Sequence, residues 1–438
     1  MSVTVDPALF PAEAERYVEE LCSFDISDIG SASWFLQRER LEKLAIQAVY
    51  NLTQQVDEFV KEFLISHNKI PVLAHELLSV ELWKSNVFPL MLEDSNEPKT
   101  GFPTYLVLYH EATLVDLLQA ALYYQESCGE VEGCIIDLVD YCHRRLTELV
   151  ATTSTYCGIE EIKTQPHEGQ HSIIKELDQQ KKDLQFGVCL KAISLATYIV
   201  DHLESLPLGV TTRLLNTHDI PCVLVNILQS APWTRTGDKG ETLKYNEAGR
   251  WVEVASSERL RLTKMEGQIW LTLYHLLMDP QCQQKYEFNQ HNKGCILKLR
   301  TYLNEPLLEQ IPQLAGLQRY LEQLSFMEPP HTKRDILLEQ VPVIYETLQA
   351  SSMGRWPLLA KRHKQVLLYP TEEDLRGLAK RWVDSCNMDL MEALVTGPPR
   401  CALCGQEASK RCSKCKGEWY CGRECQVKHW KKHKSCAC

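Results

Sequence analysis

The sequence lacks long hydrophobic runs. Among its 438 residues, no unbroken stretch of aliphatic or aromatic side chains is longer than five, whereas a membrane-spanning helix needs about 20 mostly apolar residues. The first 21 residues have neither the basic start nor the apolar centre of a secretory signal peptide. Glycine and proline, at 20 each, are too scarce for a collagen-like or low-complexity chain. We therefore expect a folded protein without a membrane span, in a reducing compartment such as the cytosol or the nucleus.

Charge and cysteine are distributed unevenly. Eight of the 18 cysteines fall in the last 38 residues, where nine Lys or Arg accompany three Glu, a net +6. The whole chain carries −11, so the first 400 residues carry −17. A body this acidic repels nucleic acid, and we expect no nucleic-acid partner. A dense cysteine cluster in a reducing compartment indicates metal ligation rather than disulfide bonds.

The first 395 residues have helical periodicity. In residues 131–150, apolar side chains recur three and four positions apart, as on one face of a helix. A later helix is predicted to begin at Thr371, with Asp374 in the capping-box position. Turn and β-branched residues predict a small hairpin inserted at 231–257. Adjacent prolines make 396–400 an extended linker. The predicted units are therefore a helical scaffold at 1–395 and a cysteine-rich unit at 401–438.

Two segments of the scaffold resemble each other. Ile70-Pro71 and Ile220-Pro221 each open a helical pattern with apolar residues two, six and seven positions after the proline. Proline suits the first helical turn, where its missing N–H would have no partner. Residues 110–118 end in the same Leu-x-x-Leu-Leu but lack the proline. The pattern resembles helix openings of armadillo-type repeats, so we predict an all-α fold with an armadillo-like solenoid body. Chance similarity between amphipathic helices is the alternative.

The cysteine-rich unit has the ligand spacing of a zinc module: two C-x2-C pairs, one C-x3-C pair, and a histidine followed by two further cysteines. Zinc prefers four soft ligands in a tetrahedron, so this set is large enough for two closed sites. A unit of fewer than 40 residues cannot bury a sufficient core, and metal must stabilise it. We therefore predict two structural Zn²⁺ ions. The candidate ligands are Cys401, Cys404, Cys412, Cys415, Cys421, Cys425, His433, Cys436 and Cys438.

These cysteines, together with residues 420–434, resemble a MYND finger, a small two-zinc module that binds other proteins. The resemblance implies two ligand sets: Cys401, Cys404, Cys421 and Cys425 for one ion, and Cys412, Cys415, His433 and a final cysteine for the other. In the family, three residues separate the histidine from the last ligand, but that position is Ala437 here. Cys436 and Cys438 therefore both stay candidates. His429 lies where the family usually has an acidic residue, and we leave it out of the ligand set.

MYND fingers bind short proline-containing peptides, and the positions matching the peptide contacts are Ser413, Gln426 and Trp430. An exposed tryptophan can pack on an extended proline segment, and a glutamine amide can pair with peptide backbone. The alternative for Trp430 is that it covers the small core of the finger. Seven thiolates and two Zn²⁺ would change the formal charge of this unit from +6 to +3, which suits an acidic protein partner.

A second resemblance extends over the body. The blocks LEKLAIQA at 41–48, DLVDYCHR at 137–144, THDIPC at 217–222 and EASKRC at 407–412 resemble, in the same order, a family of MYND-finger proteins that are cytoplasmic factors for preassembly of axonemal dynein arms. The resemblance implies an adaptor or co-chaperone whose partners are a leucine-rich-repeat assembly factor, chaperones or immunophilin co-chaperones, and axonemal dynein chains for motile cilia. It also implies a cytoplasmic location, in dynein assembly particles, at centriolar satellites or at the ciliary base.

Catalytic motifs are missing from the sequence. It contains no G-x-x-x-x-G-K-[ST], G-x-S-x-G, G-x-G-x-x-G or H-E-x-x-H, so we expect no enzyme. Cys134 and Cys142 lie on an apolar helical stripe, which favours core packing over a further metal site. Asp140 and Arg144 are spaced as a helix-surface ion pair. The alternative function is a nuclear MYND adaptor that recruits transcriptional co-repressors.

Overall fold

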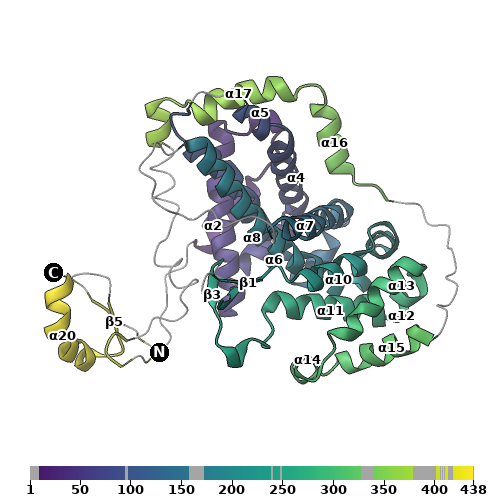
Figure 1. Cartoon of the computed structure of the whole chain (residues 1–438). Helices are drawn as coiled ribbons and strands as arrows, with labels where there is room; N and C mark the ends of the chain where they lie inside the picture. The colour runs from purple at the N-terminus through teal and green to yellow at the C-terminus, as the bar shows by residue number, and fades with distance from the viewer. Residues whose placement is uncertain are drawn as a thin grey trace.

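The computed structural model describes residues 9–93, 97–156, 172–237, 240–246, 249–326, 340–377 and 401–437, without 405, 407, 409 and 413–417. Helices dominate these residues, and the predicted all-α class is confirmed (Figure 1). The predicted helix start at Thr371 is present: its hydroxyl accepts a hydrogen bond from the Asp374 N–H at 3.2 Å. The linker predicted at 396–400 lies outside the described residues.

The body consists of two rows of stacked helices. Row A contains α2 (Ala32–Gln54), α6 (Phe102–Leu122), α8 (Ile173–Asp201), α11 (Lys264–Met278) and α15 (Leu314–Phe326). Row B contains α4 (Ile70–Asn86), α7 (Ile135–Tyr156), α10 (Ile220–Ser230) and α13 (Gln290–Leu297). Each helix packs against the next in its row, and the rows meet through the pairs α4 with α6, α7 with α8, α10 with α11 and α13 with α15. Hairpins stacked in this way form an α-solenoid, as predicted.

Local sequence determines where these helices begin. The two Ile-Pro openings are the first turns of α4 and α10, which occupy equivalent places in row B. Residues 110–118 instead lie inside α6, so this third match is not a helix opening. Capping boxes start α11, through Thr263 and Glu266, and α13, through Asn289 and Asn292. Each box satisfies backbone N–H groups that have no partner in the first helical turn.

Shorter elements connect the rows. The short helices are α1 (Pro11–Glu19), α3 (Phe59–Ser66), α5 (Phe88–Leu92), α9 (Leu208–Thr212), α12 (Pro280–Lys285) and α14 (Glu305–Gln310). The 3-10 segments are η1 (Ile26–Asp28), η2 (Gln125–Gly129), η3 (Leu203–Ser205), η5 (Ser256–Glu258) and η6 (Lys298–Thr301), and η4 (Arg213–Thr217) is a π-helix. Where a hairpin was predicted, the chain forms a three-stranded antiparallel sheet of β1 (Thr234–Thr236), β2 (Thr242–Tyr245) and β3 (Trp251–Glu253).

Helix α7 connects neighbouring hairpins through polar side chains. The prediction of a surface ion pair between Asp140 and Arg144 is wrong. Arg144 donates two hydrogen bonds to Glu81 of α4, at 2.8 and 2.7 Å. Asp140 accepts from Arg213, at 2.8 and 2.6 Å, and lies 2.5 Å from Nε2 of His218. Burial would raise the pKa of Asp140, but the hydrogen bonds from His218 and Arg213 outweigh burial and lower it to about 2.

The end of the described body returns to its beginning. Helices α16 (Val343–Ser352) and α17 (Trp356–Leu368) pack on the first hairpins, α16 against α4 and α7, and α17 against α5 and α6 (Figure 1). We call this pair the clasp. The clasp is joined to α4 by a buried hydrogen bond: Nδ1 of His363 in α17 accepts from Nε1 of Trp83 at 2.9 Å. Residues 280 positions apart in the sequence are thereby joined.

Among the described residues, one helix is long and apolar enough to cross a membrane, judged by length and composition alone. It is α8, and 56% of its most apolar window is buried inside the body. In the structure α8 is the central helix of row A, in contact with α6, α7 and α11. Burial on several sides explains an apolar composition in a core helix.

Candidate zinc centre

The cysteine-rich unit has a core of its own. Cys401, Ala408, Cys412 and Tyr420 form its fully buried cluster, which is separate from the core of the body. A two-stranded antiparallel sheet, β4 (Lys410–Arg411) with β5 (Trp419–Tyr420), precedes α20 (Arg423–Ala437). One tyrosine and three small side chains contribute little hydrophobic free energy, so a unit of this size depends on bound metal for its stability.

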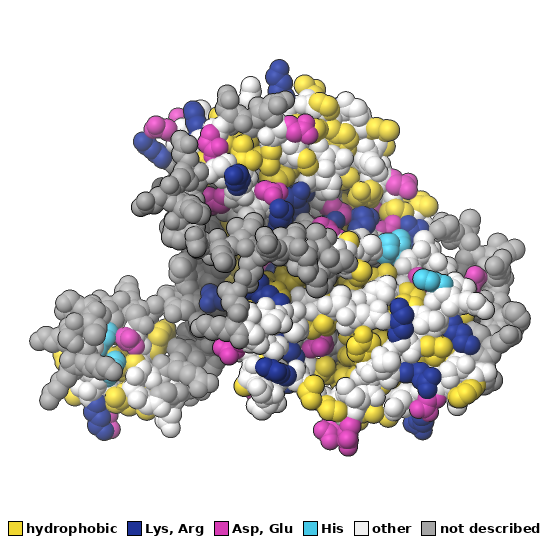
Figure 2. Space-filling model, in the orientation of Figure 1, with side chains coloured by type: hydrophobic (Ala, Val, Ile, Leu, Met, Phe, Trp, Pro, Cys, Tyr) yellow, Lys and Arg dark blue, Asp and Glu magenta, His cyan; other side chains and the backbone are white. Residues whose placement is uncertain are grey.

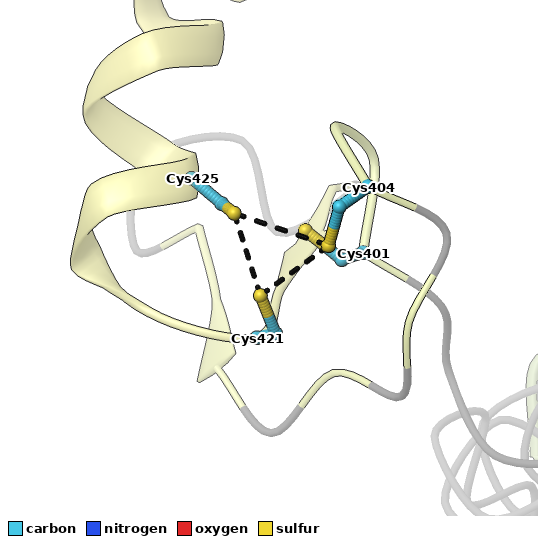
Figure 3. Close-up of side chains that lie close together, drawn as sticks. All are labelled: Cys401, Cys404, Cys421 and Cys425. Atoms are coloured by element: carbon cyan, nitrogen blue, oxygen red, sulfur yellow. Dashed lines mark hydrogen bonds between the residues drawn. The ribbon is translucent and has the colours of Figure 1, made fainter.

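Four cysteines of this unit converge on one point (Figure 3). Cys401 and Cys404 come from the first C-x2-C turn, Cys421 follows β5, and Cys425 lies in the first turn of α20. Their sulfur atoms all lie within 4.8 Å of one another. Sγ of Cys421 is 3.5 Å from Sγ of Cys404 and 3.4 Å from Sγ of Cys425. The family resemblance implied this same group of four.

The group fits a zinc ion. Zn–S bonds of about 2.3 Å in a tetrahedron place the sulfurs about 3.8 Å apart, close to the 3.4–3.9 Å separations among Cys404, Cys421 and Cys425. Four thiolates complete the coordination shell, which leaves no position for a catalytic water. Bound zinc would cross-link the first turn, β5 and α20, a structural role. Within the described part of the chain, no other cluster of ligand-type residues lies this close together.

The second predicted ligand set is described only in part. Cys412 and His433 are buried in the finger. The ring of His433 lies 6.3 Å from that of Tyr420, which belongs to the same buried cluster as Cys412. Cys415 and Cys438 lie outside the described residues. Cys436 is within α20, three positions after His433, so its backbone position is on a neighbouring face of the same helix.

Other predicted residues lie along α20. Gln426 and Trp430 are half-buried and one helical turn apart, so they share a face. The Trp430 ring packs on the finger core, 5.9 Å from the ring of His433. Ser413 lies outside the described residues. Nδ1 of His429 is hydrogen-bonded to the Tyr420 hydroxyl at 3.0 Å, a contact between β5 and α20 that the sequence spacing did not reveal.

In the body, the remaining cysteines near α7 are packing residues. Cys128, Cys134 and Cys142 are all buried. Cys134 directly precedes α7 and Cys142 lies within it, so both pack in the core, as the apolar stripe of the sequence predicted. Burial raises the pKa of both Cys134 and Cys142 to about 12, so these thiols stay protonated and do not suit a metal. The ring of the adjacent His143 stacks on that of His218 at 4.0 Å instead of approaching the thiols.

Comparison with known proteins agrees with this geometry. Residues 401–436 match the MYND finger family. The zinc finger MYND domain-containing protein 10 homolog of Drosophila melanogaster is 33% identical over 446 residues, an alignment that covers 97% of each chain. No solved structure matches the chain. The finger indicates a function in protein–protein interaction. Because the similarity extends over the body as well as the finger, the chain belongs to the zinc finger MYND domain-containing protein 10 family.

Proposed function

We propose that the chain is a non-enzymatic adaptor, or co-chaperone, for cytoplasmic preassembly of the axonemal dynein arms of motile cilia. The observation that carries the proposal is the similarity along nearly the whole chain to a relative with the same finger. The dynein-arm role comes from the family resemblance at blocks 41–48, 137–144, 217–222 and 407–412. A solenoid body supports it, since stacked helical hairpins offer long surfaces to other proteins.

The finger, in this proposal, recruits one protein and is held by two structural zinc ions. One is bound by Cys401, Cys404, Cys421 and Cys425, whose sulfurs converge. The other is bound by Cys412, Cys415 and His433, with Cys436 as the fourth ligand. Cys436 is favoured over Cys438 because α20 extends to Ala437 and places Cys436 one turn from His433. Ser413, Gln426 and Trp430 hold the partner peptide.

The body, in this proposal, binds the clients and their other assembly factors. By family resemblance these are axonemal dynein chains, a leucine-rich-repeat assembly factor, and chaperones or immunophilin co-chaperones. Their meeting place would be the cytoplasm, in assembly particles, at centriolar satellites or at the ciliary base. The −17 charge of the first 400 residues supports protein partners over nucleic acid.

The test is affinity capture from the cytosol of differentiating multiciliated cells, with three baits compared by mass spectrometry. The baits are the intact chain, a chain ending at Val395, and the Gln426→Ala/Trp430→Ala variant. We expect axonemal dynein chains and chaperones on the intact chain, and loss of one subset of partners from both altered baits. Zinc content of the double variant, measured in parallel, separates lost contact from lost folding.

Two outcomes contradict the proposal. Chromatin co-repressors without dynein chains on the intact bait would make the chain a nuclear adaptor. Equal capture of every partner by the intact chain and the chain ending at Val395 would remove the finger from recruitment.

A further inference from the structure

The outer face of the clasp differs in charge from the rest of the body. The 25 residues at 347–371 contain four Lys or Arg and no Asp or Glu, although the first 400 residues together carry −17. All four of these cations lie at the start of α17 or within it, between Arg355 and Lys364. A local positive charge on an acidic body marks this helix as a place where anionic groups are attracted.

The helical repeat places cations and apolar side chains on the same exposed face. Leu359, His363 and Leu367 are four residues apart and buried against the first hairpins. Leu358, Arg362 and Val366 are also four residues apart and lie one position earlier, on the exposed side. Leu358 is 68% exposed, Val366 is 42% exposed, and Met353, just before the helix, is 78% exposed. We call the set Arg355, Leu358, Lys361, Arg362 and Val366, with Met353, the clasp patch.

Among the described residues, Lys361 and Arg362 have no carboxylate partner, whereas Arg355 lies near Asp25 and, with the hydrogen bonds from Ser27, helps to lower the pKa of that carboxyl against the effect of burial. Among the residues that the structure describes, no ion pair involves Lys361 or Arg362 within 4.0 Å, and the Arg355 guanidinium donates to the Ser351 carbonyl at 3.0 Å. Elsewhere in the body, several buried cations are paired, for example Arg213 with Asp140 and Arg145 with Glu81. An exposed apolar group surrounded by unpaired cations is a surface that can bind a ligand with both apolar and acidic groups.

The patch is held rigidly from beneath. His363 accepts the Trp83 hydrogen bond, and the Thr104 hydroxyl donates to the Leu367 carbonyl at 3.5 Å. The Lys99 N–H donates to the Leu368 carbonyl at 3.1 Å. Side chains on a fixed helix lose little conformational freedom when a ligand binds, which favours affinity. In Figure 2, hydrophobic side chains cover much of the molecule's upper edge, where Figure 1 places α17.

We propose that the clasp patch is a docking surface for an acidic, amphipathic segment of a partner protein. Apolar side chains of the segment would pack on Met353, Leu358 and Val366, and its Asp or Glu side chains would pair with Lys361 and Arg362. This proposal rests on one part of the proposed adaptor function, namely that the body binds proteins. It does not involve the finger.

A protein segment is favoured over an anionic membrane, which has similar chemistry. A bilayer is a broad negative surface, and it would also face the acidic side chains that give the body its −17 charge. A segment one helix wide contacts the clasp patch alone. The clasp patch exposes three large apolar side chains, Met353, Leu358 and Val366, too few for an interfacial helix, which buries a whole apolar face in lipid.

The test measures binding of a synthetic peptide to the full-length, zinc-loaded chain by fluorescence anisotropy. The probe is an amphipathic helix of about 18 residues with a Leu stripe flanked by Glu and Asp, and its counterpart carries Lys and Arg instead. We expect the acidic peptide to bind at least about tenfold more tightly than the basic one. Its affinity should fall when salt is raised from about 50 to about 300 mM, because screening weakens exposed ion pairs.

A matched pair of surface variants locates the contact. Leu358→Asp/Arg362→Glu should weaken binding of the acidic peptide by about tenfold or more. The control is Leu260→Asp/Arg259→Glu, at an exposed Leu–Arg pair outside the clasp; Leu260 is 67% exposed, nearly the same as Leu358. The control should retain the affinity of the intact chain, and far-UV circular dichroism should show both variants folded.

Three results would overturn the docking proposal: equal binding of the two peptides, an equal loss in the control variant, or binding to vesicles of anionic lipid with none to the peptide. Failure of the adaptor proposal would look different from these three results, because the peptide assay does not depend on the finger. A Cys412→Ala chain, which alters the finger, should bind the acidic peptide as the intact chain does.

Discussion

Glu76 is a carboxylate buried inside the first hairpin, where it accepts a hydrogen bond from a backbone group. Its Oε1 accepts the Phe24 N–H at 3.0 Å, and its Oε2 is 4.0 Å from Nε2 of buried His110. Burial raises the pKa of Glu76 to about 7, despite the hydrogen bond from Phe24. The folded chain therefore binds a proton here near neutrality, while the unfolded chain, with an ordinary glutamate, does not.

Replacing Glu76 with Gln should stabilise the body at alkaline pH. A raised folded pKa contributes stability below about pH 4.5, and this contribution is lost as the pH rises to about 7. Gln keeps the acceptor for Phe24 and carries no charge, so the gain should be on the order of 3 kcal/mol at pH 8 and near zero at pH 4.5. Urea unfolding followed by circular dichroism measures the free energy of unfolding of both chains at pH 8 and at pH 4.5. A gain independent of pH would contradict this account of the carboxyl group.

The fourth ligand of the second zinc ion can be identified by a pair of single substitutions. Cys436→Ala should lower the zinc content from about two ions to about one per chain, because three remaining ligands bind weakly. Cys438→Ala should leave about two ions. Elemental analysis of the purified chains measures this directly. The reverse pattern would assign the ligand to Cys438.

At the scale of elements, helix α16 of the clasp is held to the body by polar capping as well as by apolar burial. Asp137 of α7 accepts hydrogen bonds from the N–H groups of Val343, Ile344 and Tyr345, at 3.1, 3.3 and 2.8 Å. These N–H groups belong to the first turn of α16, where they have no helical partner. Leu348 is the one fully buried apolar side chain within α16. A carboxylate from another helix therefore acts as the N-terminal cap of α16.

Removing this cap should release α16 without unfolding the body. Asp137→Ala should cost about 1–2 kcal/mol and speed amide exchange across Val343–Ser352. Asp137→Asn, which keeps an acceptor oxygen, should cost less. Hydrogen exchange by mass spectrometry follows both, and α17 serves as the internal reference because His363 and Trp83 anchor it separately. Equal exchange in the two variants would show that the carboxylate does not hold α16.

At the scale of the whole molecule, the described part of the chain contains two cores stabilised by different forces. The body has one continuous apolar core from Leu9 to Leu368. The apolar cluster of the finger has four fully buried members among the described residues, two of them cysteines. Burial of apolar surface stabilises the first, and metal coordination must stabilise the second.

Chelation should therefore unfold the finger alone. Removal of zinc, or Cys412→Ala, should abolish finger structure while most of the helical circular dichroism signal and the thermal unfolding of the body persist. The physical reason is that an incomplete ligand set no longer closes the metal site. The measurement is circular dichroism and zinc content before and after chelation. A cooperative loss of most helix signal on chelation would show that the body depends on the finger.

The sequence by itself determined several features of this protein. The spacing of its cysteines defined a zinc-binding unit, because ligand type and short intervals are local properties. The helical period predicted the class of the body, and the two Ile-Pro openings identified equivalent helices α4 and α10. Each of these follows from interactions over a few residues, which is why a linear pattern records them.

Only the tertiary structure decided which distant groups meet. Asp140 and Arg144 have the spacing of an ion pair, yet each binds a residue of another helix. The clasp and the capping of α16 by Asp137 had no sequence signal, since they join segments about 200 to 280 positions apart. The reason is physical. A charged side chain pairs with whichever partner the packing of helices brings within reach, and packing depends on the whole chain.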